Sequence, residues 1–269
     1  MVIEQKNIVP CKICGALPVN KTIKSKNRDI TVKIMAYPCN CLDREEEANK
    51  KQKIWNDLLR RSKIPPRYRA ASLDYTGRSP YENLVIPLCC NYISRLTDTL
   101  RHTKETIFTP LEGFGLIGDV GTGKTHYICA IALALLRAGH TCLFLNVPDF
   151  YDALKRCFSN NDDNNTEKYA NLLDSARETE IVAFDDIGAE YNTQWTVDEL
   201  CKIINYRYNY NLITLFTSNL RAKITKEVLP SELENKIGKR ATDRLREMCR
   251  VHLITGDSLR GKKKHPQIL

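Results

Sequence analysis

The stretch Leu111 to Thr125, LEGFGLIGDVGTGKT, decides the fold of this chain. Its apolar residues 114–117 predict a buried strand, and residues 126–137, rich in Ala, Leu and Ile, predict a helix. Between them, residues 118–125 match G-x-x-x-x-G-K-[ST] at every fixed position. In such a unit, the backbone N–H groups of the loop and of the helix N-terminus point at a bound phosphate. A glycine-rich turn that matches by chance would not need both flanking elements, so the stretch predicts nucleotide binding.

Two residues of this loop have predicted roles of their own. Lys124 would reach the β- and γ-phosphate oxygens of ATP, and the Thr125 hydroxyl would bind Mg²⁺. The backbone of the loop would surround the phosphates. The predicted nucleotide-binding residues of the loop are Gly118, Asp119, Val120, Gly121, Thr122, Gly123, Lys124 and Thr125.

A second predicted strand, 181–185, ends in two carboxylates, Asp185 and Asp186. A continuous apolar run is typical of a buried parallel strand, which delivers the residues at its end to the carboxyl edge of the sheet. We expect Asp185 to belong to the Mg²⁺ shell and Asp186 to orient or activate the attacking water.

A third predicted strand, from residue 212, leads to Asn219. In an alternating β/α fold the end of this strand lies beside the phosphate loop. Asn219 is therefore predicted to contact the γ-phosphate or its water. The alternative is an Asn that caps the next turn.

Two arginines follow on a predicted helix. Arg240 and Arg244 lie on one helical face at i and i+4. They are either surface charge or contacts to a phosphate, including a phosphate bound by a neighbouring subunit. Spacing alone leaves both readings open.

Cysteine pairs near the N-terminus predict a metal site. Cys11 and Cys14 form a C-x-x-C pair, and Cys39 and Cys41 form a C-x-C pair after a polar spacer. Two close thiol pairs can converge on Zn²⁺, and a segment with so few apolar residues needs a metal to fold. Free buried cysteines are the alternative. The eleven cysteines as a group indicate a reducing compartment, the cytoplasm.

The chain of 269 residues is long enough for one large domain and a small accessory one. We predict a zinc-binding domain at 1–45, a helical linker at 46–66 that ends at a Pro-Pro pair, and an ATPase domain at 67–269. Residues 1–69 carry the whole net charge of +9, and basic surfaces usually bind polyanions. A solvated charged face is the alternative. No apolar stretch approaches a membrane span in length, so no membrane partner is expected.

Taken together, these motifs resemble a known family. Residues 111–260 are similar to AAA+ ATPases of the bacterial DnaC/DnaI helicase-loader group, which serves DNA replication and has the IstB transposition ATPase as a close relative. The segments that carry the resemblance are LIGDVGTGKTH, IVAFDDIGAE, TLFTSNL, KRATDRL and ITGDSLRG. The N-terminal cysteines look like the zinc-bearing, helicase-binding domain of DnaI-like loaders.

The resemblance implies an α/β AAA+ P-loop NTPase fold with a central parallel sheet. It implies that Asp185 and Asp186 are the Walker B residues, that Asn219 is sensor 1, and that Arg244 is an arginine finger acting across a subunit interface. Arg240 would support Arg244, and Arg260 would be the sensor-2-like arginine. The implied cofactors are ATP, Mg²⁺ and Zn²⁺. The implied partners are a replicative DNA helicase, single-stranded DNA and further copies of the chain joined through ATP.

One position departs from the family pattern. Many AAA+ proteins have Glu where this chain has Asp186, and the shorter side chain predicts slow, partner- or DNA-stimulated hydrolysis. Glu190 could partly substitute. For DNA, the sequence offers Tyr206, Tyr208 and Tyr210 with Arg207, although some of these are expected to face the core.

Three other readings remain open. An IstB-like transposition regulator would share every ATPase motif but bind duplex DNA and a transposase; the cysteine-rich N-terminus argues against it. A small-molecule kinase would not need the strand end at Asn219 or the paired arginines. A DNA-binding adaptor with a silent ATPase is disfavoured by the intact Lys124 and Asp185.

Overall fold

The computed structural model describes residues 12, 16, 19–24, 31–36, 40–77, 81–102, 110–158, 164–189, 193–220 and 231–260. The chain divides into two compact units, Met1–Asp57 and Leu58–Leu269. The division into a zinc domain, a linker and an ATPase domain at residues 45 and 66 stays a prediction.

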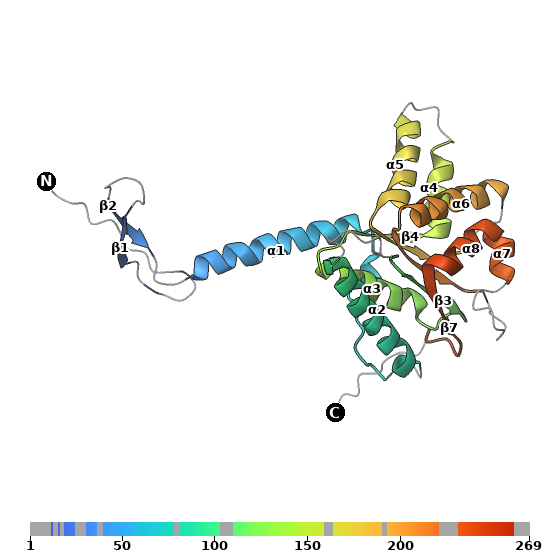
Figure 1. Cartoon of the computed structure of the whole chain (residues 1–269), viewed down its shortest axis with the longest axis horizontal. Helices are drawn as coiled ribbons and strands as arrows, with labels where there is room; N and C mark the ends of the chain where they lie inside the picture. The colour runs from blue at the N-terminus through green and yellow to red at the C-terminus, as the bar shows by residue number, and fades with distance from the viewer. Residues whose placement is uncertain are drawn as a thin grey trace. The chain divides into compact units, whose positions relative to one another are not determined.

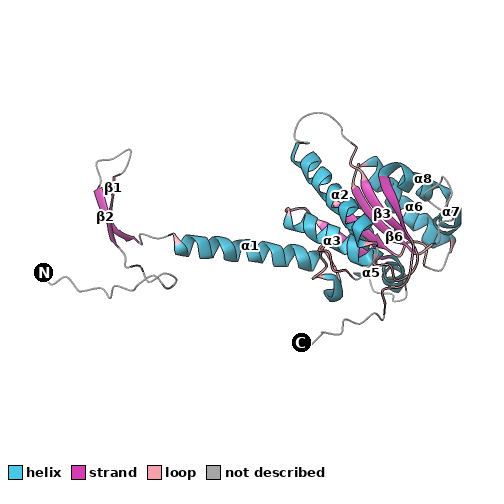
Figure 2. Cartoon of the chain, turned by 90° about the horizontal axis from the view of Figure 1, so that it is seen from below, coloured by secondary structure: helices cyan, strands magenta, loops and turns pink. Residues whose placement is uncertain are grey.

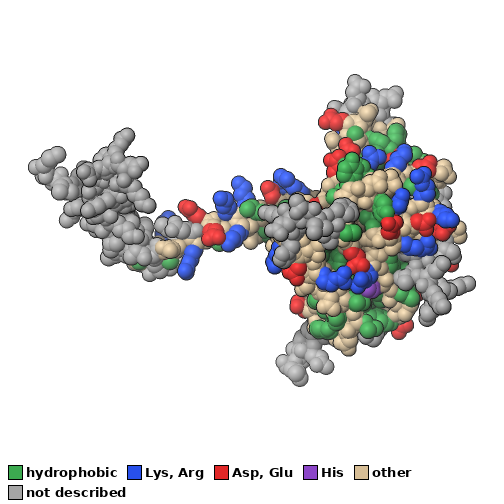
Figure 3. All heavy atoms as spheres, viewed as in Figure 1, with side chains coloured by type: hydrophobic (Ala, Val, Ile, Leu, Met, Phe, Trp, Pro, Cys, Tyr) green, Lys and Arg blue, Asp and Glu red, His purple; other side chains and the backbone are tan. Residues whose placement is uncertain are grey.

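The N-terminal unit contains an antiparallel ribbon of β1 (Val19–Lys24) and β2 (Thr31–Ala36). The helix α1 (Cys41–Arg61) begins in this unit and ends in the larger one. Side chains of both charges line α1 (Figure 3), and Lys51 Nζ lies 2.8 Å from Glu47 Oε1. Such an exposed pair adds little stability, because water screens the two charges. Most of α1 is therefore a solvated helix.

A parallel sheet forms the centre of the larger unit (Figure 2). It has five strands in the order β4-β5-β6-β3-β7. Its inner strands β3, β5 and β6 are buried over their whole length, as expected for a sheet covered on both faces. The predicted central parallel sheet is confirmed. The strands are β3 (Gly113–Gly118), β4 (Cys142–Asn146), β5 (Ile181–Asp185), β6 (Ile213–Ser218) and β7 (Cys249–Ile254).

Helices cover both faces of this sheet (Figure 1). On one face α2 (Glu82–His102) packs against α3 (Lys124–Arg137), and the 3₁₀ turn η1 (Pro66–Tyr68) contacts α3. On the other face a single apolar core joins the remaining helices to the strands. These helices are α4 (Val147–Arg156), α5 (Asn164–Glu178), α6 (Gln194–Asn209), α7 (Ser231–Ile237) and α8 (Lys239–Met248). Among the described helices, none has the length and apolar character needed to cross a bilayer.

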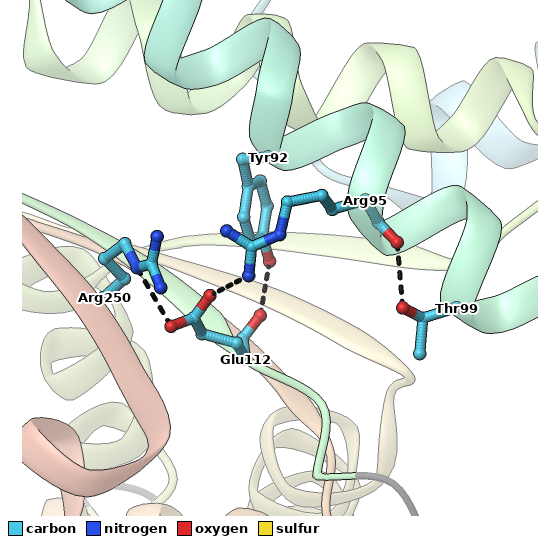
Figure 4. A network of polar contacts seen from close by, with 5 residues as sticks. All are labelled: Tyr92, Arg95, Thr99, Glu112 and Arg250. Atoms are coloured by element: carbon cyan, nitrogen blue, oxygen red, sulfur yellow. Dashed lines mark hydrogen bonds and ion pairs between the residues drawn. The ribbon is translucent and has the colours of Figure 1, made fainter.

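A polar network around Glu112 joins α2 to the sheet (Figure 4). The Glu112 carboxylate accepts hydrogen bonds from Arg95 Nη2 at 2.8 Å and from Arg250 Nε at 3.0 Å. The Tyr92 hydroxyl donates to the Glu112 carbonyl oxygen at 3.0 Å. Because Glu112 directly precedes β3, the network fixes the start of the strand that leads to the phosphate loop.

Arg207 of α6 lies inside the molecule, with none of its surface exposed. Burial lowers the pKa of its guanidinium to about 9. All three guanidinium nitrogens donate to groups at the end of α5 and at the starts of β5 and β6. These groups are the carbonyl oxygens of Ala176, Arg177, Thr179, Glu180 and Ile213 and the hydroxyl of Thr214. Of the four residues that the sequence offered for DNA contact, Arg207 is thus one that faces the core, as was expected of some of them.

The prediction from sequence differs from the structure at one helix and one strand. The seven residues of α7 are too few to show a clear helical pattern. The sequence also predicts a last short strand at residues 251–255. In the structure this strand is Cys249–Ile254, because α8 passes into β7 without an intervening loop.

Candidate nucleotide-binding site

The loop between β3 and α3 has the backbone that a phosphate-binding loop requires. Gly118 has φ 131° and Gly121 has φ 84°, which is the region that favours glycine. A Cβ atom on Gly118 would lie 2.0 Å from the Ile254 carbonyl oxygen, and one on Gly121 would lie 2.1 Å from Ser258 Oγ. These glycines therefore let the loop press against the segment that follows β7.

Hydrogen bonds join the loop to that segment. The backbone N–H of Asp119 donates to the Ile254 carbonyl oxygen at 3.1 Å, and the Asp119 carboxylate accepts from the backbone N–H of Gly256 at 3.0 Å. The N–H of Leu259 donates to the Gly121 carbonyl oxygen at 2.9 Å. The segment 255–260 thus fixes the conformation of the loop and places Arg260 beside it.

Lys124 is the first residue of α3 and is only 4% exposed. Its Nζ donates to the carbonyl oxygens of Gly118 at 3.0 Å and Asp119 at 2.6 Å. Burial lowers the pKa of Lys124 to about 8, against the opposing effect of Asp186 and other nearby carboxylates. A buried ammonium group among loop carbonyls is suited to exchange these partners for phosphate oxygens.

Asp185 ends β5 and is 5% exposed. Its Oδ1 accepts hydrogen bonds from the Thr125 and Thr217 hydroxyls, each at 2.8 Å. A carboxylate and a hydroxyl oxygen this close together are hard ligands of the kind that Mg²⁺ prefers. The two residues predicted to bind Mg²⁺, Thr125 and Asp185, thus lie side by side.

Asp186 lies at the end of the same strand, with a left-handed φ of 61°. Its backbone N–H donates to Thr217 Oγ1 at 2.9 Å, and its Oδ1 accepts from Asn219 Nδ2. Burial, with the charge of Asp185, raises the pKa of the Asp186 carboxyl. Asn219 therefore contacts the residue predicted to activate water, as a γ-phosphate sensor would.

Sequence reasoning missed Thr217. This hydroxyl donates to Asp185 and accepts from the backbone of Asp186, so it joins both predicted Walker B residues to β6. The only sequence signal was the polar end of the strand, Thr217-Ser218-Asn219, from which Asn219 alone was selected.

A cavity of about 310 Å³ opens between the loop, the ends of the strands and residues from the ranges 67–76 and 82–86. Glu82, 6% exposed, shapes this wall by accepting hydrogen bonds from the backbone N–H groups of Thr76 and Gly77, each at 2.8 Å. The lining residues are Arg67, Tyr68, Ser72, Asp74, Thr76, Glu82, Ile86, Gly121, Gly123, Lys124, Thr125, His126, Tyr127, Asp186, Asn219, Leu259 and Arg260.

The predicted arginines separate into two groups. Arg260 lines the cavity together with Lys124 and Asn219. Arg244 does not line it: its guanidinium lies over the Tyr208 ring, 4.1 Å from the ring centroid. Arg240 is exposed on the same helix, α8.

The predicted zinc site falls mostly outside the described residues. Cys11, Cys14 and Cys39 are not among them, and Cys41 is the first residue of α1. Within the described ranges, no group of three or more His, Cys, Asp or Glu side chains could hold a metal. Zinc binding by the four cysteines stays a prediction, and Glu190 also lies outside the described part of the chain.

Comparisons with known proteins agree with this geometry. The model of the family described as "IstB-like ATP binding protein" matches residues 24–267. The chain is 34% identical over 125 residues to the replicative helicase loader DnaI of Bacillus subtilis, covering 46% of this chain and 38% of that protein. It is 25% identical over 205 residues to the replicative helicase loader DnaC of Escherichia coli, covering 76% of this chain and 73% of that protein.

Solved structures share the fold of the larger unit. A crystal structure of the DnaC helicase loader has a TM-score of 0.57 at 23% identity, over 71% of this chain and 99% of that one. DnaI has a TM-score of 0.54 at 23% identity, over 72% and 95%. AMPPCP-bound DnaA from Aquifex aeolicus has a TM-score of 0.51 at 16% identity, over 72% and 51%. The phosphate loop, the Walker B strand and the match over residues 24–267 together place the chain in one family. It belongs to the IstB-like ATP-binding proteins, a family of AAA+ ATPases that includes the DnaC and DnaI helicase loaders.

Proposed function

We propose that this chain is an ATP-dependent loader of a replicative DNA helicase, which binds ATP with Mg²⁺, single-stranded DNA and the helicase. The observation that carries the proposal is the meeting of Lys124, Asp186, Asn219 and Arg260 at one cavity, in a chain whose relatives are named replicative helicase loaders. Because the match covers only 38% of the Bacillus loader, the loading activity itself is a proposal. The role would place the chain in the cytoplasm.

In this proposal Lys124 and the loop backbone bind the phosphates, and Thr125 with Asp185 holds Mg²⁺. The metal would neutralise charge on the β- and γ-phosphates. Asp186, kept in place by Asn219, would accept a proton from the attacking water or orient it. The side chain of Asp186, shorter by one methylene than the Glu that many AAA+ proteins have at this position, supports slow hydrolysis that a partner accelerates.

Arg260 and Arg244 would act on different nucleotides. Arg260 lines the cavity of its own chain and would contact the phosphates there. Arg244 lies outside that cavity and would contact the nucleotide of a second copy, with Arg240 supporting it on the same helix. ATP binding would thereby join subunits and let basic surfaces hold single-stranded DNA.

The N-terminal unit would hold the helicase. We propose that Cys11, Cys14, Cys39 and Cys41 bind Zn²⁺ there; free thiols are the alternative. Zinc measured by atomic emission in the purified chain, and in a Cys14→Ser variant, distinguishes the two.

A second candidate function is an IstB-like transposition regulator, which the name of the matched family favours. It would bind duplex DNA and a transposase. The relatives named helicase loaders favour the first function.

The proposed function is tested by two binding measurements. Co-sedimentation with the purified replicative helicase, with ATP present, should give a complex. A salt titration of DNA binding should show that the chain prefers single strands over duplex DNA at each salt concentration. Duplex preference without helicase binding would overturn the loader and support the transposition regulator.

A further inference from the structure

Three side chains from α6 and α8 form a cluster at the surface of the larger unit. The Arg244 guanidinium lies over the ring of Tyr208, 4.1 Å from the centroid. The Tyr208 hydroxyl donates a hydrogen bond to Glu247 Oε1, and Arg244 Nη1 lies 3.8 Å from Glu247 Oε2. Each member of this Arg244 cluster therefore contacts the other two.

The cluster is not needed to hold α6 and α8 together. The two helices already share a buried apolar core that includes Ile203, Ile204, Ala241 and Leu245. In contrast, the side chains of Arg244 and Glu247 are 39% and 62% exposed. Exposed ion pairs contribute little to stability, because water screens them.

The geometry suits a guanidinium that must be ready for a ligand. An aromatic face under the guanidinium and a carboxylate at its side restrict a long, flexible side chain. A separation of 3.8 Å from Glu247 is too long for a strong hydrogen bond, and arginine has five N–H donors. The cluster therefore orders Arg244 without using all of its donors.

The two other arginines of α8 are placed differently. Arg246 Nη1 forms an ion pair with Asp243 Oδ1 at 2.9 Å on the same helix. Arg240 is exposed. Among the described ring contacts, only Arg244 of these three lies over an aromatic ring.

We infer that Tyr208 and Glu247 are positioning residues for Arg244, holding its guanidinium in the orientation in which it contacts ATP bound by a second copy of this chain. This inference rests on the proposed role of Arg244 in trans. Tyr208 supplies the larger effect through its ring, and Glu247 fixes the tilt of that ring through the hydroxyl.

The test compares Tyr208→Leu, Tyr208→Phe, Arg244→Ala and the control Arg246→Ala. ATP turnover is measured at saturating ATP with single-stranded DNA, over a range of protein concentrations, and melting temperature is measured in parallel. Tyr208→Leu should lower kcat roughly tenfold, because it removes the stacking surface. Tyr208→Phe keeps the ring and should stay within roughly threefold of wild type. KM for ATP should not change in either variant, and Arg246→Ala should behave as wild type.

A mixing experiment separates positioning from a structural role. A Lys124→Ala subunit has a defective ATP site but intact Tyr208 and Arg244. Mixed with Tyr208→Leu subunits, whose ATP sites are intact, it should restore turnover, as it should with Arg244→Ala subunits. A Tyr208→Leu defect that mixing does not rescue, while Arg244→Ala is rescued, would overturn the inference.

Two further outcomes are distinct. Normal turnover of Tyr208→Leu beside a defective Arg244→Ala overturns the inference and leaves the proposed role of Arg244 standing. Normal turnover of Arg244→Ala overturns that role, and the inference with it.

Discussion

The two edges of the central sheet hold buried charges in opposite ways. At the amino edge, Arg207 donates to six groups, five of them backbone carbonyls that cannot move without unfolding the strands. At the carboxyl edge, Lys124 donates to two loop carbonyls and shares a cavity with Asp186 and Asn219. The difference teaches that a buried charge saturated by fixed partners supports the fold, whereas one beside a cavity is available to a ligand.

Arg207→Met should destabilise the fold at the amino edge of the sheet, and we expect it to have the largest effect of the changes described here. It removes a buried cation and leaves several carbonyls without a donor, so the free energy of unfolding should fall by about 4 kcal/mol. Urea denaturation followed by circular dichroism measures this. The exposed Arg246→Met should change the same quantity by less than about 0.5 kcal/mol. Equal losses in the two variants would contradict the structural role of Arg207.

Lys124→Ala should impair ATP turnover at the carboxyl edge of the sheet without a comparable loss of stability. Turnover of ATP should fall at least about 100-fold, because a preorganised positive charge at the phosphates is lost. The melting temperature should not fall, since burial already disfavours the ammonium form of Lys124. A phosphate-release assay and a thermal melt check both statements. Turnover within tenfold of wild type would remove Lys124 from the site.

Arg260→Ala sharpens the comparison by testing a more exposed charge of the same cavity. Loss of one charge-assisted contact should raise the dissociation constant for ATP roughly tenfold. Isothermal titration calorimetry with ATP and with ADP measures this. A larger loss for ATP than for ADP would place Arg260 at the γ-phosphate, and equal affinity to wild type for both would exclude it.

The pH dependence of binding should show the smallest effect. The pKa of Lys124 is about 8, below its ordinary value, so the ammonium form that binds phosphate is lost as pH rises through 8. ATP affinity should therefore fall several-fold between about pH 7.5 and 9, with proton uptake on binding. In Lys124→Arg the guanidinium stays charged, so whatever affinity remains should be constant over this range. A flat wild-type profile would contradict the shifted pKa.

The sequence predicted those parts of the site that are local in the chain. Residues 118–125 carry their own pattern, and the strand that ends at Asp185 and Asp186 is a continuous apolar run. The alternation of strands and helices then predicted a parallel sheet with these ends together. Each of these inferences needs only residues close together in the chain and the spacing of the apolar residues among them.

The parts that could not be predicted depend on residues distant in sequence. Thr217 is an ordinary strand residue until it is seen to bond Asp185 and Asp186 of the adjacent strand. The sequence could not tell which of Tyr206, Arg207, Tyr208 and Tyr210 face the core, because the carbonyls around Arg207 come from α5, from the residues just before β5 and from β6, and only the fold brings them together. Glu82 contributes to the cavity through a loop whose path no local pattern describes.

The position of β3 in the sheet has a consequence for synthesis on the ribosome. This strand lies between β6 and β7, both of which follow it in the chain. The phosphate loop is hydrogen-bonded to Ile254 and Gly256, at and just after the end of β7. The loop therefore leaves the ribosome well before the strands that support it. A chain stalled before residue 249 would contain every residue from Gly118 to Asn219 and still lack an assembled site. Nascent-chain folding of the ATPase unit is thus completed late, when its last strand emerges.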